Sequence, residues 1–318
     1  MISLDSRTSR AALPPGASAT AGSGARRPLA AGLVPLVLSA LALALLPTHA
    51  DAQRGGGENA RFTQTGPRLT LADLERIAPR LESANPAEVQ EALFDLVVID
   101  KPEVVPPIAA LLRRGQPDAI TDDAIRALGQ LEAPEAIEVL TEFTNHRRTP
   151  ARRAAYEALG AIDDRRVPAL LARGLSDGDR GIRGSAASLL GEMGPRARSE
   201  IDRLFLAFER GVVEAGPAVG KVGAEDTIER FHAFLEGTIP FAVMLSGYRA
   251  YLGREDISLE AKTGIVVRLN ELGTVAARDF LNDYLNELPD NPRSRRVRKL
   301  REAVEEALRT IYDQKGKA

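Results

Sequence analysis

The dipeptide Leu-Gly returns at a fixed interval in the middle of this chain. Gly129 lies in "ALGQL", Gly160 in "ALGAI" and Gly191 in "LLGEM", so each glycine follows the previous one by 31 residues. A period of this length is typical of repeat architectures, in which each unit covers its apolar face only by stacking on its neighbours. The interval therefore predicts an all-α fold, an α-solenoid of stacked helix pairs.

A column of small residues shares the same 31-residue frame. It contains Ala124, Ala155 and Ala186, and the third of these lies between Ile182 and Leu190 at helical spacing. Residues three and four apart form one stripe on a helix, so this pattern predicts the buried face of the second helix of each pair. We expect the alanines to lie in the core, where a small side chain lets two helix backbones approach closely.

The three recurring glycines form the next structural column. Each of Gly129, Gly160 and Gly191 directly follows a leucine of the buried stripe. Helices often end on a glycine in the left-handed conformation, because a Cβ atom is penalised there. We therefore interpret these glycines as the residues that end each second helix.

The unit "DGDRGIRGSAASLLG" resembles the repeats of the HEAT family, and more narrowly the short variant named after phycobilisome lyases. The pattern of that family runs Asp, Val-Arg, Ala and Leu-Gly. Arg152 and Arg183 occupy its arginine position in two successive units. The resemblance implies that this arginine pairs with an aspartate of a neighbouring turn, such as Asp177 or Asp179. It is strongest over residues 97–192.

The first part of the chain has the features of an export signal. Arg26 and Arg27 precede an apolar run, Leu29–Leu46, and the small-residue triplet Ala50–Ala52 follows. This order predicts a secretory signal peptide, residues 1–52, that a signal peptidase removes. The apolar run is also near the minimum of about 17 residues for a membrane helix, so an uncleaved N-terminal anchor is the alternative.

The rest of the chain divides into a linker and two helical regions. Residues 53–67 are polar and Gly-rich, which is typical of a flexible linker. Residues 68–220 hold the 31-residue HEAT-like repeats, and the strict frame is lost in residues 221–318. There we expect degenerate helical repeats with a C-terminal capping helix, or alternatively a separate helical bundle. The helical segments predicted in this region are 225–236, 240–252, 257–272, 274–287 and 294–312.

No motif for catalysis, a cofactor or a metal is found. The chain has three histidines and no cysteine, and no H-E-x-x-H spacing occurs. His146 and His232 are expected at the surface or its boundary. The segment "GPAVGKVG" around Lys221 lacks the first glycine and the Ser/Thr of a phosphate loop. We therefore predict no cofactor, no metal and no enzymatic activity.

Two basic clusters stand out against a net charge of −2. One is "NHRRTPARR", which includes Arg147 and Arg152, and the other is "RSRRVRKLR", which begins at Arg293. An anionic partner is one interpretation. The alternative for the second cluster is a solvated helix end whose arginines pair with the glutamates that follow. No aromatic residues interleave the arginines for base stacking, so nucleic acid is not the expected partner.

These observations predict a non-catalytic protein-binding or scaffolding protein of the bacterial cell envelope, exported to the periplasm. Solenoids present long surfaces that mostly recognise proteins. Exposed positions of the second helices, Arg152, Tyr156 and Arg183, are the predicted partner-binding residues. The alternatives are a lyase-type protein that acts on a chromophore-bearing or other modified partner, and an adaptor held in the inner membrane by Leu29–Leu46.

Overall fold

The computed structural model of this chain describes residues 69–237 and 239–315. They belong to one compact unit, Thr65–Ala318. Regular structure in the described ranges is entirely helical, which confirms the predicted all-α class. The signal peptide or anchor predicted for residues 1–52 and the linker predicted for 53–67 lie outside the described residues, and both stay predictions.

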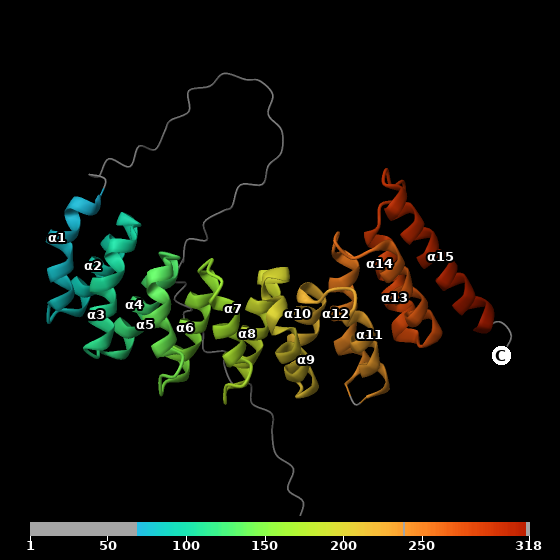
Figure 1. Ribbon diagram of the computed structural model, residues 1–318, viewed down its shortest axis with the longest axis horizontal. Helices are drawn as coiled ribbons and strands as arrows, with labels where there is room; N and C mark the ends of the chain where they lie inside the picture. The colour runs from blue at the N-terminus through green and yellow to red at the C-terminus, as the bar shows by residue number, and fades with distance from the viewer. Residues whose placement is uncertain (1–68, 238, 316–318) are drawn as a thin grey trace, which may run out of the picture. The chain divides into compact units, whose positions relative to one another are not determined.

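The helices alternate between a first and a second member of each pair (Figure 1). The first members are α1 (Leu74–Ile77) with the 3-10 helix η2 (Ala78–Glu82), α3 (Val105–Arg113), α5 (Ile137–Phe143), α7 (Val167–Gly174), α9 (Ile201–Glu209) and α11 (Thr227–His232). The second members are α2 (Pro86–Ile99), α4 (Asp118–Gln130), α6 (Thr149–Ala161), α8 (Arg180–Met193), α10 (Ala215–Val222) and α12 (Phe241–Gly253). Helices α13 (Leu259–Glu271), α14 (Val275–Glu287) and α15 (Arg295–Lys315) complete the unit.

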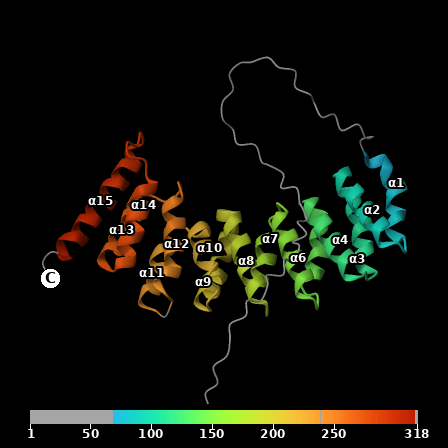
Figure 2. The same cartoon turned by 180° about the vertical axis from the view of Figure 1, so that it is seen from behind.

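Consecutive second helices stack side by side along the unit. Helix α2 packs on α4, α4 on α6, α6 on α8, α8 on α10 and α10 on α12. Each first helix between α3 and α9 also packs against the second helix that follows it. Figures 1 and 2 show this order from both sides. The arrangement is the stacked helix-pair solenoid that the 31-residue interval predicts.

Polar residues in the turns determine where several second helices begin. The Asp179 carboxylate accepts a hydrogen bond from the backbone N–H of Ile182 at 3.0 Å, at the start of α8. The Asn85 side chain accepts one from the N–H of Ala87 at 3.1 Å, at the start of α2. Such caps satisfy N–H groups that have no partner within the helix. Side chains of the turns therefore fix the beginning of α2 and α8.

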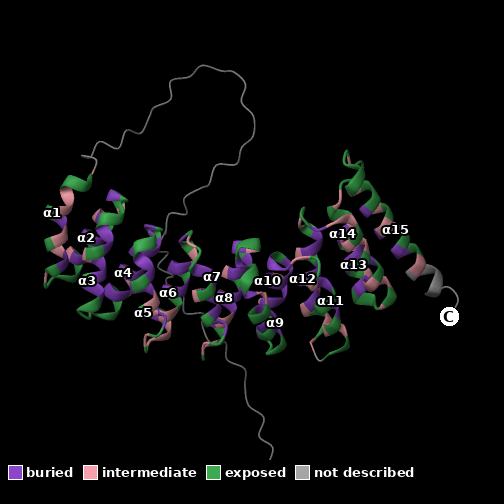
Figure 3. Cartoon of the chain, viewed as in Figure 1, coloured by how far each residue is buried: buried purple, intermediate pink, exposed green. Residues whose placement is uncertain are grey.

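The predicted core columns are buried. Ala124, Ala155 and Ala186 are completely inaccessible to solvent, and so are Ile182 and Leu190. In Figure 3 the buried residues run along the interior of the stacked pairs and the exposed ones along the edges. The alanine column therefore lies where the helices approach one another, as the sequence predicts.

The interpretation of the recurring glycines as left-handed helix ends is wrong. Gly129, Gly160 and Gly191 lie inside α4, α6 and α8, and none has a positive φ angle. A Cβ atom on Gly129 would lie 2.9 Å from the Cβ of Ala158, and one on Gly191 would lie 3.1 Å from the Cα of Ala218. The missing side chain is therefore needed for contact between consecutive second helices, not for a turn.

The Gly-rich segment 212–223 contains α10, which packs between α8 and α12. A Cβ on Gly220 would collide with the backbone carbonyl of Gly247 in α12. The glycines of α10 therefore bring its backbone unusually close to the next helix, while the strict sequence period is lost.

Helical pairing continues beyond residue 220. The predicted segments agree with α11 to α15 to within a few residues at most ends. Helix α14 packs on α12 and α15 packs on α13 and α14. Aromatic rings fill the core at this point, with Phe208 stacked on Phe231 at 5.5 Å between ring centroids and Phe231 edge-on to Tyr248 at 5.1 Å. No helix in the described ranges combines the length and the apolar character that crossing a membrane requires.

Candidate protein-binding surface

Arg152 of α6 forms a two-bond ion pair with Asp177 in the turn between α7 and α8. Its Nε and Nη2 atoms each lie 2.9 Å from a carboxylate oxygen. Nη1 donates to the carbonyl oxygen of His146 at 3.1 Å. The arginine bond holds the pKa of Asp177 below its usual value. This confirms the pairing that the HEAT resemblance implies, and it links one repeat to the next.

Arg183 repeats only half of this arrangement. Its Nη1 donates to the carbonyl oxygens of Asp177 at 2.9 Å and Gly178 at 3.2 Å, as Arg152 does one unit earlier. Asp177 lies three residues before α8, and Val212 occupies the same place before α10. Among the described residues Arg183 has no ion pair with a carboxylate, so the arginine–aspartate series ends here.

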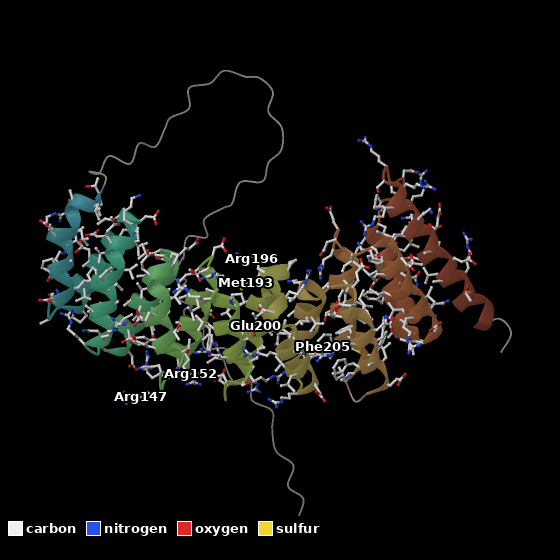
Figure 4. The ribbon with its side chains drawn as sticks, in the orientation of Figure 1. Arg147, Arg152, Met193, Arg196, Glu200 and Phe205 are labelled. Atoms are coloured by element: carbon white, nitrogen blue, oxygen red, sulfur yellow. The ribbon has the colours of Figure 1, made fainter. Side chains whose placement is uncertain are left out.

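The predicted exposure of Tyr156 is wrong. Tyr156 is only 4% exposed, and burial raises the pKa of its hydroxyl. Its ring fills space beside Gly174 of α7, where a Cβ would lie 3.0 Å from the ring. Figure 4 shows Arg152 and Arg147 at the edge where first and second helices are joined. The partner-binding roles of Arg152, Tyr156 and Arg183 stay predictions, and Tyr156 can act only by positioning its neighbours.

The basic cluster before α6 is largely neutralised within the chain. Arg148 forms ion pairs with Asp118 and Asp122 of α4. Arg153 lies 3.6 Å from an oxygen of Asp179. In the described part of the chain Arg147 has no such pair, and its side chain is exposed. Most of this positive charge therefore stabilises the junction between repeats.

The C-terminal basic cluster is partly used in packing. Arg296 donates to the carbonyl oxygens of Glu255 and Ile257, and Arg301 pairs with Glu305 at 3.0 Å, one helical turn away. The second contact confirms part of the pairing expected for a solvated helix end. The exposed cations of this cluster without an ion pair among the described residues are Arg293, Arg295, Arg298 and Lys299.

Two grooves lie between the ends of neighbouring first helices. The α3–α5 groove, about 590 Å³, is lined by Arg113 and Glu142, whose side chains pair at 2.6 Å, and by Asp118, among others. The α7–α9 groove, about 420 Å³, is lined by three arginines and no carboxylate. Two grooves of the same architectural origin thus differ in electrostatic character.

Two large apolar side chains are exposed on helix α2. Phe94 of α2 is 67% exposed, and Val98, one turn along, is 47% exposed. Phe94 lines a groove of about 290 Å³ between α2 and α4, and a further groove of about 360 Å³ lies between α4 and α6. Arg126 and Gln130 line both. We call the surface made by Phe94, Val98 and these two grooves the second-helix face.

Polar groups at the edge of the second-helix face are paired with one another. Gln90 donates to Asp123 at 2.6 Å, and Arg126 contacts the other oxygen of the same carboxylate at 2.8 Å. Paired groups lose less on desolvation than free charges do. This edge can therefore be covered by a partner without leaving an isolated charge.

Neither His146 nor His232 takes part in a cluster of metal-ligating residues in the described ranges. His232 is buried, at 6% exposed, which corrects the expected surface location. Its Nδ1 lies 2.8 Å from the hydroxyl of Tyr248, and burial lowers the pKa of the imidazole. His146 accepts a hydrogen bond from the N–H of Arg148 at 3.2 Å and stacks on Phe143. Both are explained by local structure.

Sequence reasoning missed Phe94 and the three-arginine groove. A signal for the groove was present, because Arg173 occupies the position of Glu142 one 31-residue period later. A change from an acidic to a basic residue at one repeat position indicates that the surface there differs from that of the neighbouring repeats. For Phe94 the sequence contains no comparable signal, because an aromatic at helical spacing more often belongs to the core.

Comparison with known proteins supports the repeat assignment. The family model of HEAT repeats matches residues 74–155 and, overlapping these, 105–191. No curated protein matches this sequence.

Solved structures resemble the chain at low identity. Human deoxyhypusine hydroxylase in complex with glycerol is 17% identical, covers 75% of this chain and 96% of its own, and gives a TM-score of 0.36. The complex of CpcE and CpcF of phycocyanin lyase from Nostoc is 19% identical, covers 82% of this chain and 100% of its own, and gives a TM-score of 0.32. An engineered protein is 15% identical, covers 74% of this chain and 68% of its own, and gives a TM-score of 0.41. The helix pairs, the ion pair between repeats and the match to the family model together show that residues 74–191 consist of HEAT repeats.

Proposed function

We propose that this chain is a non-catalytic protein-binding scaffold and that a partner docks on the second-helix face. The observation that carries the proposal is the exposure of Phe94 beside Val98 on α2. Adjacent exposed apolar side chains on a helix are typical of interaction sites, and aromatic residues contribute strongly to binding where they become fully covered.

The neighbouring groove indicates the chemistry of the partner. Leu93, Val97 and Ala127 contribute apolar surface to it, while its polar edge is paired internally. Such a site favours an amphipathic protein segment that inserts an apolar side chain between α2 and α4 and leaves its polar face in water. The HEAT architecture supports this proposal, because stacked repeats offer extended surfaces rather than enclosed pockets.

We further propose that the protein is exported to the bacterial envelope and acts in the periplasm. The support is the order of Arg26 and Arg27, the apolar run Leu29–Leu46 and the triplet Ala50–Ala52. Cell fractionation combined with sequencing of the mature N-terminus tests this proposal. A periplasmic protein that begins at Gln53 supports it, and a membrane-bound chain that keeps the run indicates the anchored adaptor instead.

Affinity capture after crosslinking in the native cells tests the scaffold function. The comparison is between the parent chain, Phe94→Asp and the control Val267→Asp, which places the same charge on an exposed apolar residue of α13. We expect one reproducible partner to be captured by the parent and the control and lost from Phe94→Asp. Equal capture by all three chains would show that the second-helix face is not the binding surface.

A further inference from the structure

The α7–α9 groove is a cationic surface of unusual composition. Its charged lining consists of Arg173, Arg203 and Arg210, and Leu175, Leu206 and Ser176 lie between them. No aspartate or glutamate is among its lining residues. Arg203 is partly neutralised by Glu200, with an N–O distance of 2.9 Å. Arg173 and Arg210 have no ion pair among the residues that the structure describes.

Local structure fixes the backbone from which two of these arginines project. Arg173 lies in the last turn of α7. Arg210 follows α9 directly, before Gly211 with a φ angle of +83°. The N–H of Val212 donates to the carbonyl oxygen of Ala207 at 3.0 Å, which closes the end of the helix. Both guanidinium groups therefore start from ordered backbone at the same edge of the solenoid.

The α3–α5 groove supplies an internal comparison. There Glu142 of α5 lies opposite Arg113 of α3 and binds it through two contacts, at 2.6 and 3.3 Å. In the α7–α9 groove the residues opposite Arg173 of α7 are Arg203 and Arg210. A cation at a helix C-terminus is favourable, but this effect accounts for single arginines and not for the absence of every carboxylate from one groove. The charge of the α7–α9 groove is therefore that of a binding site whose negatively charged groups are supplied by a bound partner.

The apolar part of the groove distinguishes between possible anions. Leu206 is 42% exposed between Arg203 and Arg210 on α9. A free phosphate gains nothing from an exposed leucine, whereas a peptide can place an apolar side chain on it. Arginine also binds carboxylates through two parallel hydrogen bonds.

The geometry points to this groove as a second docking site, for an acidic peptide segment of a partner protein in which Asp or Glu residues flank an apolar one. This inference rests on the proposed role as a protein-binding scaffold, but it concerns a different surface. The carboxylates bind Arg173 and Arg210, and the apolar side chain covers Leu206. Binding weakens as salt concentration rises, since all three cations are near the solvent.

Fluorescence anisotropy with a labelled Glu-Leu-Glu-type peptide tests the inference on the full chain. We expect saturable binding that weakens at least about tenfold in Arg173→Glu, which places a carboxylate in the groove. The control Arg165→Glu changes the same charge at the other end of α7 and should bind as the parent does. Leu206→Ser should weaken the leucine-containing peptide and leave a Glu-Ser-Glu peptide unchanged.

Four results would overturn the inference. Equal weakening by Arg165→Glu would mean that only the net charge matters. Equal affinity for the two peptides, or displacement by inorganic phosphate at the concentration of the peptide, would mean a general anion surface. Absence of binding by the parent would exclude the site. Thermal melting of each variant shows whether it is folded, and Arg173→Gln replaces Arg173→Glu if the latter is unstable.

The outcome is separable from that of the scaffold proposal. Phe94→Asp should bind the acidic peptide as the parent does, because α2 is remote in sequence and does not line the α7–α9 groove. Conversely, Arg173→Glu should still capture the partner that depends on Phe94. If one of the two proposed sites does not bind, binding at the other site can therefore still be observed.

Discussion

Gly129 of α4 faces Ala158 of α6 so closely that a Cβ on the glycine would lie 2.9 Å from the alanine Cβ and 3.0 Å from its Cα. The recurring Leu-Gly dipeptide is therefore a contact between consecutive second helices. Any larger side chain at this position must push one backbone away from the other.

Replacing Gly129 with alanine should destabilise the fold even though alanine favours helices. The close Ala158 backbone has no flexible group that could yield, so we expect a loss of about 1–3 kcal/mol. Gly264→Ala is the matched control, because Gly264 lies in α13 with nothing within 4 Å of its Cβ position. It should stabilise the protein by up to about 1 kcal/mol. Thermal melting of the two variants should show shifts of opposite sign.

The alanine column gives a second stability test. Ala155 of α6 is completely buried, so Ala155→Arg would force a charge between packed helices and should cost several kcal/mol, roughly 3 or more. Ala161→Arg, at the exposed end of the same helix, should have little effect. If Ala155→Arg unfolded in urea at the same concentration as the parent, the buried register of the second helices would be incorrect.

The arginine–aspartate pair should respond differently in two successive repeats. Arg152→Gln leaves Asp177, which is nearly buried, without its two-bond partner, and should cost about 2 kcal/mol. Arg183→Gln removes only bonds to carbonyl oxygens and should cost less. The same variants test the predicted partner-binding roles, since binding that falls without a change in melting temperature would place the residue at an interface.

The pH dependence of the Arg152–Asp177 pair follows from the lowered pKa of Asp177. Because the folded-state pKa is below the unfolded value, the pair stabilises the protein fully above about pH 4, the unfolded pKa. This stabilisation is lost as the pH falls through the folded pKa. Unfolding of Asp177→Asn in urea should therefore show a smaller loss of stability on acidification than the parent does. An unchanged acid dependence would mean that the pair adds nothing to it.

The buried His232 predicts a separate pH effect near neutrality. Burial lowers its pKa, and the Nδ1 atom contacts the Tyr248 hydroxyl, so the neutral ring is favoured in the folded state. Its contribution is complete above about pH 6.5 and decreases as the pH falls through the lower folded pKa. His232→Asn should flatten this part of the stability profile. An unchanged profile in this variant would show that His232 does not cause the pH effect.

Sequence periodicity predicted the helix pairs and the alanine core because both depend on contacts that repeat every 31 residues. It did not identify the function of the glycines. A close helix contact and a left-handed turn both require a missing Cβ, so the two cannot be distinguished from the residue type alone. The position of Gly129 within α4 decides between them.

The candidate surfaces were less predictable because they depend on departures from the repeat. Tyr156 occupies a second-helix position whose counterpart one period later is Ala187, and the extra volume is used in local packing rather than displayed. The α7–α9 groove is a departure of the same kind, because Arg203 and Arg210 lie opposite Arg173 where the α3–α5 groove has Glu142 opposite Arg113.

Site-specific photocrosslinking on the second-helix face is the most direct test of the scaffold account. A photoreactive phenylalanine analogue is placed at position 94 in the full chain and, as a control, at the exposed Val275 of α14. We expect position 94 to crosslink one partner protein in the native cells and position 275 not to crosslink it. Equal labelling of the same proteins from both positions, or no protein partner at position 94, would contradict this expectation.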